Sequence, residues 1–252
     1  MNSLSTSTFI HSQSKAGKKM LAVLIDPDKP CKESFLAQAG ALGVDLFFVG
    51  GSLLVHGSIG SCIQQIRQHS TSPIILFPGS AMQIDASADG ILLLSLISGR
   101  NPEYLIGQQV IAAPLLRQSK LDILPTGYLL IESGKSTTAS YMSGTTPIPS
   151  DKPEIAAVTA LAGAQLGLQY IYLDGGSGAQ QPVSAAIIKA VKNEISIPLI
   201  VGGGIRSAEQ LHAAYEAGAD IVVIGTSLEN NPALLPTFID IANNFTTKLI
   251  SF

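Results

Sequence analysis

The sequence predicts a single-domain α/β fold, a closed (β/α)8 barrel, and three observations lead to it. Eight short apolar segments alternate with helical patterns along a chain of 252 residues, as expected for buried parallel strands. The length suits one large α/β domain, and no linker divides the chain into halves. A doubly wound open sheet, the runner-up, predicts a glycine fingerprint after the first strand, where this chain has Asp26-Pro27-Asp28. We therefore expect an N-terminal extension over residues 1–19 and the barrel over residues 20–252.

The first four strands are expected where apolar runs stop at turn-forming residues. Residues 20–25 end at Asp-Pro-Asp-Lys-Pro, whose prolines interrupt any regular element, and residues 44–49 end at Gly50-Gly51-Ser52. The third and fourth strands are predicted over residues 74–77 and 89–94. Helical spacing predicts helices over residues 33–42 and 59–69, and a third that follows the loop 98–102 and runs to about residue 116.

The last four strands follow the same rule, over residues 123–131, 170–173, 197–201 and 220–224. A polar insertion rich in Ser, Thr, Gly and Pro occupies residues 132–152. The next helix, residues 153–168, has Pro153 in its first turn and Gly167 at its end, as helix termini prefer. Further helices are predicted over residues 183–193, 208–217 and 232–243.

Composition and charge exclude several classes of protein. A hydrophobic content of 46% with only 13% charged residues fits a large core and not a disordered chain. The net charge of −3 provides no basic surface for nucleic acid. Cys31 and Cys62 lack metal-site or disulfide-framework spacing, no apolar segment of a signal peptide accompanies the N-terminal lysines, and the apolar runs are too short to span a bilayer. We therefore expect a cytoplasmic protein.

Three neighbouring junctions carry glycine, and together they predict a phosphate site. These junctions are Asp174–Gly178 after the sixth strand, Gly202–Gly204 after the seventh and Gly225-Thr226 after the eighth. In (β/α)8 barrels the active site lies at the carboxyl ends of the strands, and the loops after strands 7 and 8 often bind phosphate. Backbone N–H groups of the glycines, with the helix start at Ser207, would hold the anion.

Acidic side chains occupy two of the remaining positions at the predicted mouth. Asp174 stands beside the phosphate site, where it could accept a proton or a hydroxyl hydrogen bond, or could simply form a turn before glycine. Asp26 and Asp28, with Ser52 on the next junction, suit Mg²⁺, which takes few protein ligands and keeps substrate phosphates. The alternative for Asp26 and Asp28 is a loop start in which Lys29 pairs with one of the acids.

Other kinds of catalysis find little support in the sequence. The histidines have no partners at zinc-ligand spacing, and no Ser-His arrangement indicates acyl transfer. A Schiff-base aldolase is disfavoured because no Lys ends a barrel strand, apart from Lys29 in the first loop.

Taken together, the junction motifs resemble those of the geranylgeranylglyceryl phosphate synthase family, which includes the bacterial heptaprenylglyceryl phosphate synthases. The resemblance runs from about residue 18 to residue 245, with the motifs in matching order. The most specific pair is Asp-Pro-Asp-Lys and Tyr-Leu-(Asp/Glu)-x-Gly-Ser-Gly. They stand here as Asp26–Lys29 and Tyr172–Gly178, beside Gly50-Gly51-Ser52, Val201–Arg206 and Gly225-Thr226.

The resemblance implies an activity and assigns residues to it. The activity is Mg²⁺-dependent transfer of a polyprenyl group, geranylgeranyl by expectation, from its diphosphate to the 3-hydroxyl of sn-glycerol 1-phosphate, giving an ether-lipid precursor. Asp26 and Ser52 match the magnesium positions, and Asp26 and Asp174 are the expected catalytic residues. Asp174 stands where the family often has Glu, and Gly175 where Ala is usual. The residues that match the glycerol phosphate site are Tyr172, Leu173, Asp174, Gly175, Gly176, Ser177, Gly178, Gly203, Gly204, Gly225 and Thr226.

The resemblance also implies a homo-oligomer, a dimer or hexamer, and we expect transient membrane contact when the lipid product leaves. Two other functions stay open from the residues alone. A phosphate-binding barrel isomerase or aldolase would share the glycines of the last three junctions, and a non-catalytic phosphoglycerol-binding protein would keep them without reactive acids. Asp26, Ser52 and Asp174 favour the prenyltransferase.

Overall fold

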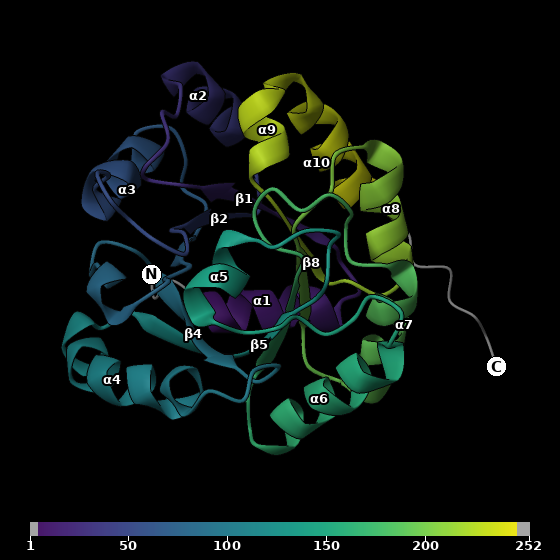
Figure 1. Cartoon of the computed structure of the whole chain (residues 1–252). Coiled ribbons are helices and arrows are strands. Elements are labelled where there is room, and N and C mark those ends of the chain that lie inside the picture. Colours follow the sequence, from purple (N-terminus) through teal and green to yellow (C-terminus); the bar gives the residue numbers. More distant parts are fainter. Residues whose placement is uncertain (1–4, 246–252) are drawn as a thin grey trace.

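The computed structural model describes residues 5–245, which form a closed barrel of eight parallel strands (Figure 1). Each strand pairs with the next in the chain, and the last pairs with the first. The strands are β1 (Met20–Ile25), β2 (Leu46–Val49), β3 (Ile74–Leu76), β4 (Gly90–Leu96), β5 (Asp122–Leu130), β6 (Tyr170–Asp174), β7 (Leu199–Gly202) and β8 (Ile221–Ile224). The predicted fold class is confirmed.

Helices surround the barrel in Figure 1. They are α1 (Thr6–Lys15), α2 (Glu33–Leu42), α3 (Ile59–Arg67), α4 (Gln108–Ser119), α5 (Thr138–Ser143), α6 (Pro153–Gln165), α7 (Ala185–Glu194), α8 (Ala208–Glu216), α9 (Thr226–Asn230) and α10 (Leu235–Asn244). Short 3-10 helices η1 (Ala81–Gln83) and η3 (Pro232–Leu234) and one π-helical turn, η2 (Glu103–Gly107), complete the set. Within residues 5–245, no helix is both long and apolar enough to cross a membrane.

The alternation of strand and helix fails at one place. Between β3 and β4 the chain forms only η1, a single turn of three residues, in place of an α-helix. Pro78 and Gly79 follow soon after β3, and both residue types disfavour the start of a regular element there. At β3 and β4 the barrel therefore lacks a helix of its own; α4 and η2 contact β4, and η1 packs against α4.

Strand alternation divides the core into two layers and aims the acids of the site. Leu21, Val23 and Ile25 of β1 lie in the outer cluster between strands and helices, whereas Met20, Ala22 and Leu24 belong to the inner cluster inside the barrel. The next inward position is Asp26. Along β6, every second residue likewise points inward, first Tyr170, then Tyr172 and finally Asp174. Period-two geometry alone thus brings both acids to the mouth of the barrel.

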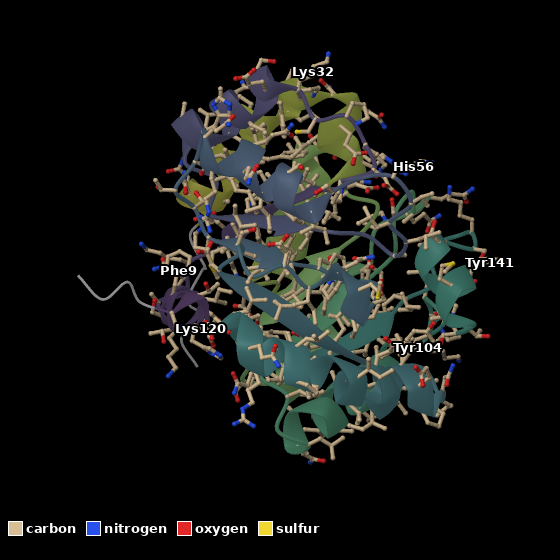
Figure 2. The ribbon with its side chains drawn as sticks, turned by 90° about the vertical axis from the view of Figure 1, so that its left-hand side faces the viewer. Phe9, Lys32, His56, Tyr104, Lys120 and Tyr141 are labelled. Atoms are coloured by element: carbon tan, nitrogen blue, oxygen red, sulfur yellow. The ribbon has the colours of Figure 1, made fainter. Side chains whose placement is uncertain are left out.

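The N-terminal extension contains a helix, α1, that sequence patterning did not indicate. Its Ile10 is fully buried in the inner cluster, and the Ser7 amide donates to Asp122 Oδ2 (2.6 Å) while its hydroxyl lies 2.8 Å from the Tyr170 hydroxyl. Figure 2 places Phe9 of this helix at the opposite end of the molecule from His56 and Tyr141. The helix closes the amino-terminal end of the barrel. The outer ends of the predicted extension and barrel, residues 1–4 and 246–252, lie outside the described residues.

The polar insertion folds over the opposite end. It forms α5, which begins with a capping box between Thr137 and Ser140, and it is tied to β5 by a bridge between Ile131 and Ile148. Figure 1 shows α5 lying across the barrel. The insertion therefore forms part of the wall around the site.

Candidate functional site

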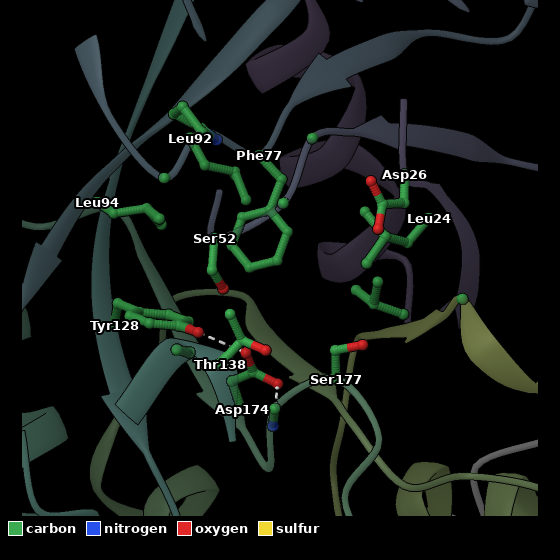
Figure 3. Close-up of a pocket in the computed structure, with 18 of the residues that line it drawn as sticks. Leu24, Asp26, Ser52, Phe77, Leu92, Leu94, Tyr128, Thr138, Asp174 and Ser177 are labelled. Carbon is green, nitrogen blue, oxygen red and sulfur yellow. Dashed lines mark hydrogen bonds between the residues drawn. The ribbon is translucent and has the colours of Figure 1, made fainter. Parts of the chain in front are cut away.

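One cavity of about 530 Å³ opens at the carboxyl ends of the strands (Figure 3). It brings together all but two of the residues that the family resemblance assigned to the site. Those that line it are Asp26, Ser52, Tyr172, Asp174, Gly176, Ser177, Gly178, Gly203, Gly204, Gly225 and Thr226.

Leu173 and Gly175 do not line the cavity. Leu173 is fully buried in the outer cluster, because an inward Tyr172 and an inward Asp174 force the residue between them to face the helices. Its side chain therefore faces away from the mouth, and the assignment of Leu173 to the acceptor site stays a prediction. Gly175 is buried, and a Cβ there would stand 3.5 Å from the Cβ atoms of Ser133 and Ala179.

Glycine allows the loops after β6 and β7 to pack against each other. Gly176, Gly203 and Gly204 have φ angles of +85°, +86° and +77°, which side chains rarely tolerate. A Cβ on Gly203 would lie 2.7 Å from the amide nitrogen of Gly176, and one on Gly204 would lie 2.6 Å from the carbonyl oxygen of Gln181. Backbone therefore approaches backbone, and a phosphate here would meet peptide groups and not side-chain carbon.

The loop after β8 completes this wall, whereas the start of α8 does not. The Ser177 and Thr226 hydroxyl oxygens are 3.5 Å apart, which joins the loops after β6 and β8. Ser207 is absent from the cavity wall, because its hydroxyl caps α8 by accepting from the Gln210 amide (3.3 Å). The Arg206 amide donates to Gln210 Oε1 (2.7 Å), so two donors of this helix start are already used, and its role in holding the anion stays a prediction.

Asp174 is a buried carboxylate with two donors. The Tyr128 hydroxyl donates a short hydrogen bond to Oδ2, and the Gly176 amide donates to Oδ1 at 2.7 Å (Figure 3). Burial raises the pKa of Asp174 above its usual range, and the two hydrogen bonds lower it in part. The result is a carboxylate held in one orientation with a greater affinity for a proton than a solvated Asp.

Sequence reasoning missed Tyr128, which packs in an aromatic cluster behind the acid. Tyr128 meets Tyr172 and Phe77 edge-on, with ring centroids 5.5 and 6.0 Å apart, and Phe77 stacks on Tyr172 at 5.1 Å. Gly202 leaves room for this arrangement, because a Cβ there would lie 2.4 Å from the Tyr172 hydroxyl oxygen. The signal for Tyr128 was its inward position two residues before the end of β5, in register with Tyr172.

Asp26 stands across the mouth from Asp174, with Ser52 and Phe77 between them in Figure 3. Its Oδ1 accepts from the Asp28 amide (3.0 Å), and its Oδ2 lies 3.5 Å from Lys29 Nζ. Lys29 makes a closer ion pair with Glu229, at 2.8 Å. Asp26 is therefore only loosely paired and faces the open cavity.

Asp28 has a different task from Asp26. Its carboxylate accepts from the backbone amides of Val55, His56 and Gly57 at 2.7, 2.9 and 2.6 Å. These bonds lower the pKa of Asp28, chiefly through the amides of His56 and Gly57. Of the two acids that flank Pro27, one thus holds the loop after β2, which carries Ser52, and the other is free to bind a ligand.

The cavity continues from the acids into an apolar channel. The channel uses the side of the barrel that lacks a helix between β3 and β4, so outward-facing residues of β4 line it together with η1 and α4. Its walls include Ala81, Ile84, Ile91, Leu93, Ala112 and Leu116.

Comparisons with known proteins agree with this geometry. Residues 15–242 match the model of the PcrB family. A geranylgeranylglyceryl phosphate synthase of Spirosoma linguale is 51% identical over 246 residues, which cover 96% of this chain and 99% of the relative. The crystal structure of (S)-3-O-geranylgeranylglyceryl phosphate synthase from Thermoplasma acidophilum in complex with substrate sn-glycerol-1-phosphate matches with a TM-score of 0.89 and 32% identity, over 96% of this chain and all of that one.

A more distant likeness concerns the fold alone. The tryptophan synthase alpha chain of Legionella pneumophila matches 96% of this chain with a TM-score of 0.62, at 18% identity and over 99% of its own length. The match of residues 15–242 to the family model and the relative of 51% identity show family membership as well as fold. The chain belongs to the PcrB family, with the geranylgeranylglyceryl phosphate synthases.

Proposed function

We propose that this protein transfers a polyprenyl group, geranylgeranyl by family, from its diphosphate to the 3-hydroxyl of sn-glycerol 1-phosphate, forming an ether-lipid precursor. One observation carries the proposal. A single cavity, which Asp26 also lines, joins a glycine-walled anion site with a buried carboxylate, Asp174, to an apolar channel. Such a cleft suits two substrates, one small and anionic, the other long and apolar.

The acceptor half would be built from the loops after β6, β7 and β8. Peptide groups of Gly176, Gly203 and Gly204 would surround the phosphate without interference from Cβ atoms. Fixing the phosphate there orients the 3-hydroxyl toward Asp174, so that transfer becomes an effectively unimolecular step. The Thermoplasma acidophilum relative was crystallised in complex with substrate sn-glycerol-1-phosphate, which supports this choice of acceptor.

Asp174 would act as the base. The acceptor oxygen forms a bond to the allylic carbon of the donor, the bond from that carbon to the diphosphate breaks, and the hydroxyl proton passes to the carboxylate. A pKa raised by burial favours acceptance of that proton, and the donors Tyr128 and Gly176 fix the carboxylate's direction. Asp is one methylene shorter than Glu, so the acceptor would have to sit close to the end of β6.

The donor half would use the other side of the mouth. Transfer of a prenyl chain from water into an apolar channel is favourable by about 0.8 kcal/mol for each methylene-sized unit. The channel lined by η1 and α4 offers such a surface, and the diphosphate would sit near Asp26, which lines the same cavity.

The residues around Asp26 fit a magnesium ion. A ring of three or more His, Cys, Asp or Glu ligands is lacking in the part of the chain that the structure describes, so an ion here would take the Asp26 carboxylate and the Ser52 hydroxyl and complete its shell with water and phosphate oxygens. When bound, Mg²⁺ would neutralise the diphosphate and make it a better leaving group.

No specific observation favours the isomerase or aldolase that the glycines alone allow. A small phosphorylated substrate would use the glycine wall and leave the channel toward Leu93 and Leu116 without a purpose.

Contacts beyond the substrates are also proposed. Leu53, Val55, Met82, Tyr141 and Met142 are exposed large side chains on the loops around the mouth, which supports transient contact with a membrane as the product leaves. The outer faces of η2, α4 and α6 expose a second set of apolar residues, which supports a homo-oligomer (Ile106, Val110, Ile111, Leu115, Ile155, Val158 and Leu166). A cytoplasmic location and the choice between dimer and hexamer stay predictions.

A transfer assay tests the proposal. Purified protein is incubated with Mg²⁺, radiolabelled sn-glycerol 1-phosphate and prenyl diphosphates of graded length, and the lipid is extracted with butanol. We expect label in the organic phase with a long donor, and none when the enantiomer, sn-glycerol 3-phosphate, replaces the acceptor at equal concentration. Absence of transfer with every donor would refute the proposed function.

A further inference from the structure

The residues predicted so far give the acceptor phosphate hydroxyl and backbone donors but no cationic side chain. Glycine loops supply N–H dipoles but no net charge. Asp26, Asp174 and Glu229 all line the same cavity, and their carboxylates repel a phosphate. A cation near the loops after β6 and β7 is therefore needed to balance the site.

Two of the three basic side chains near the glycine wall are already engaged. The Lys29 ammonium pairs with Glu229 at 2.8 Å and lies 3.5 Å from Asp26. The Arg206 guanidinium donates to the backbone carbonyl oxygens of Ala179 and Gln180.

Lys135 is the third, and among residues 5–245 its ammonium has no hydrogen-bond or ion-pair partner. A Cβ added to Gly178 would stand 3.4 Å from Lys135 Nζ, so the ammonium lies directly over the loop after β6. The ion pairs among residues 5–245 do not include Lys135. Its position is therefore not explained by a carboxylate partner.

The backbone directs Lys135 to that position. The Ser133 carbonyl oxygen accepts from the amides of both Gln180 and Gln181, at 3.0 and 3.2 Å, which fastens the start of the insertion to the end of the glycine loop. The next residue, Gly134, has a φ of +88°, and a Cβ there would lie 2.8 Å from Gln180 Oε1. This tight turn aims the following side chain back over Gly178.

We propose that Lys135 binds the phosphate of the acceptor, which its ammonium reaches from the insertion side while the glycine loops hold it from below. The inference rests on the proposed function, since it names a further ligand of the same site. It also gives the insertion a role, because ordering of Lys135 by phosphate would fasten the segment that leads into α5 over the mouth.

Steady-state kinetics of Lys135→Met, Lys135→Arg and a control, Lys152→Met, test this. Lys152 is an exposed lysine of the same insertion, at the N-terminal end of α6. Neither lysine lines the cavity, and the two differ in that the Lys135 ammonium lies beside Gly178. For Lys135→Met we expect the KM for sn-glycerol 1-phosphate to rise by about tenfold, the effect of losing one charge-assisted hydrogen bond, with the KM for the prenyl diphosphate unchanged. Lys135→Arg should recover most of the affinity, and Lys152→Met should behave as wild type.

Two outcomes would overturn the inference. One is an unchanged acceptor KM in Lys135→Met, and the other is a rise confined to the prenyl diphosphate, which would move the ammonium to the donor. Melting temperatures identify any variant that fails to fold, and equilibrium binding of sn-glycerol 1-phosphate without donor gives an independent measure. Failure of the proposed function is distinct, because the wild-type protein would then transfer no label.

Discussion

The two sides of the barrel mouth differ in which atoms line them, backbone on one side and side chains on the other. On the acceptor side, the loops after β6, β7 and β8 present backbone, and glycines at positive φ let Gly176 and Gly203 touch. On the donor side, the wall consists of apolar side chains from β4, η1 and α4, at the place where a helix is missing. A site made of backbone tolerates almost no substitution at its glycines, whereas a channel made of side chains can change its shape by single substitutions.

The largest effect is expected on the donor side, at Asp26. Asp26→Ala should lower kcat by about a hundredfold or more, because several kcal/mol of charge stabilisation depend on the carboxylate and its cation. Transfer assays over a range of Mg²⁺ concentrations measure this. Asp151→Ala, which removes an exposed acid outside the cavity wall, is the matched control and should keep full activity. An Asp26→Ala enzyme with wild-type kcat would disprove the assignment.

The acceptor side should respond next, and through backbone geometry. Gly203→Ala places a Cβ 2.7 Å from the Gly176 amide nitrogen, so we expect the acceptor KM to rise by about tenfold and the melting temperature to fall. Gly43→Ala is the control, because Gly43 also has a positive φ, +72°, but no atom lies within 4 Å of its Cβ position. That variant should lose stability alone. Equal KM values in the two variants would contradict a backbone-built site.

Removal of the Tyr128 hydroxyl should change the pH dependence of the reaction through Asp174. The Tyr128 hydrogen bond lowers the pKa of Asp174, so Tyr128→Phe should raise that pKa and move the acid limb of kcat/KM to higher pH. Activity would fall most at low pH and recover as the pH rises. Tyr215→Phe removes another buried hydroxyl, one that donates to the Met20 carbonyl (2.9 Å), and should leave the limb in place. An unshifted limb in Tyr128→Phe would mean that Asp174 is not the base.

The smallest effect is expected in the channel, because side chains can repack. Ala112→Leu on α4 should raise the KM of long prenyl diphosphates by about fivefold while short donors and the acceptor are little affected. Ala113→Leu, on the exposed face of the same helix, should change neither. Kinetics with a series of donor lengths would show this, and a uniform effect on all lengths would place the prenyl chain elsewhere.

The same contrast explains how much could be predicted from the sequence. The glycines of the acceptor wall could be predicted because tight turns directly after strands require glycine, and such turns are visible as short motifs in the sequence. Asp26 and Asp174 were predicted because each directly follows an apolar run, at the expected end of a strand. The channel was not predicted, because it depends on an absent helix between β3 and β4 and on side chains from segments far apart in the chain.

Two further features depend on tertiary contacts and escaped prediction. The helix α1 has a weak apolar pattern of its own and is held by Ile10 inside the barrel and by the bond from Ser7 to Asp122. Tyr128 resembled an ordinary strand residue until the register of β5 and β6 placed it beside Asp174. In both cases, the partner lies more than 40 residues away in the chain.

Binding of sn-glycerol 1-phosphate in the absence of donor tests the division of the mouth most directly. Isothermal titration calorimetry would compare the wild-type protein, Asp26→Ala and Gly203→Ala. A two-part cleft predicts that Asp26→Ala binds the acceptor within about a factor of two of wild type, while Gly203→Ala binds it about tenfold more weakly. Loss of acceptor binding in Asp26→Ala, or wild-type binding in Gly203→Ala, would contradict the account.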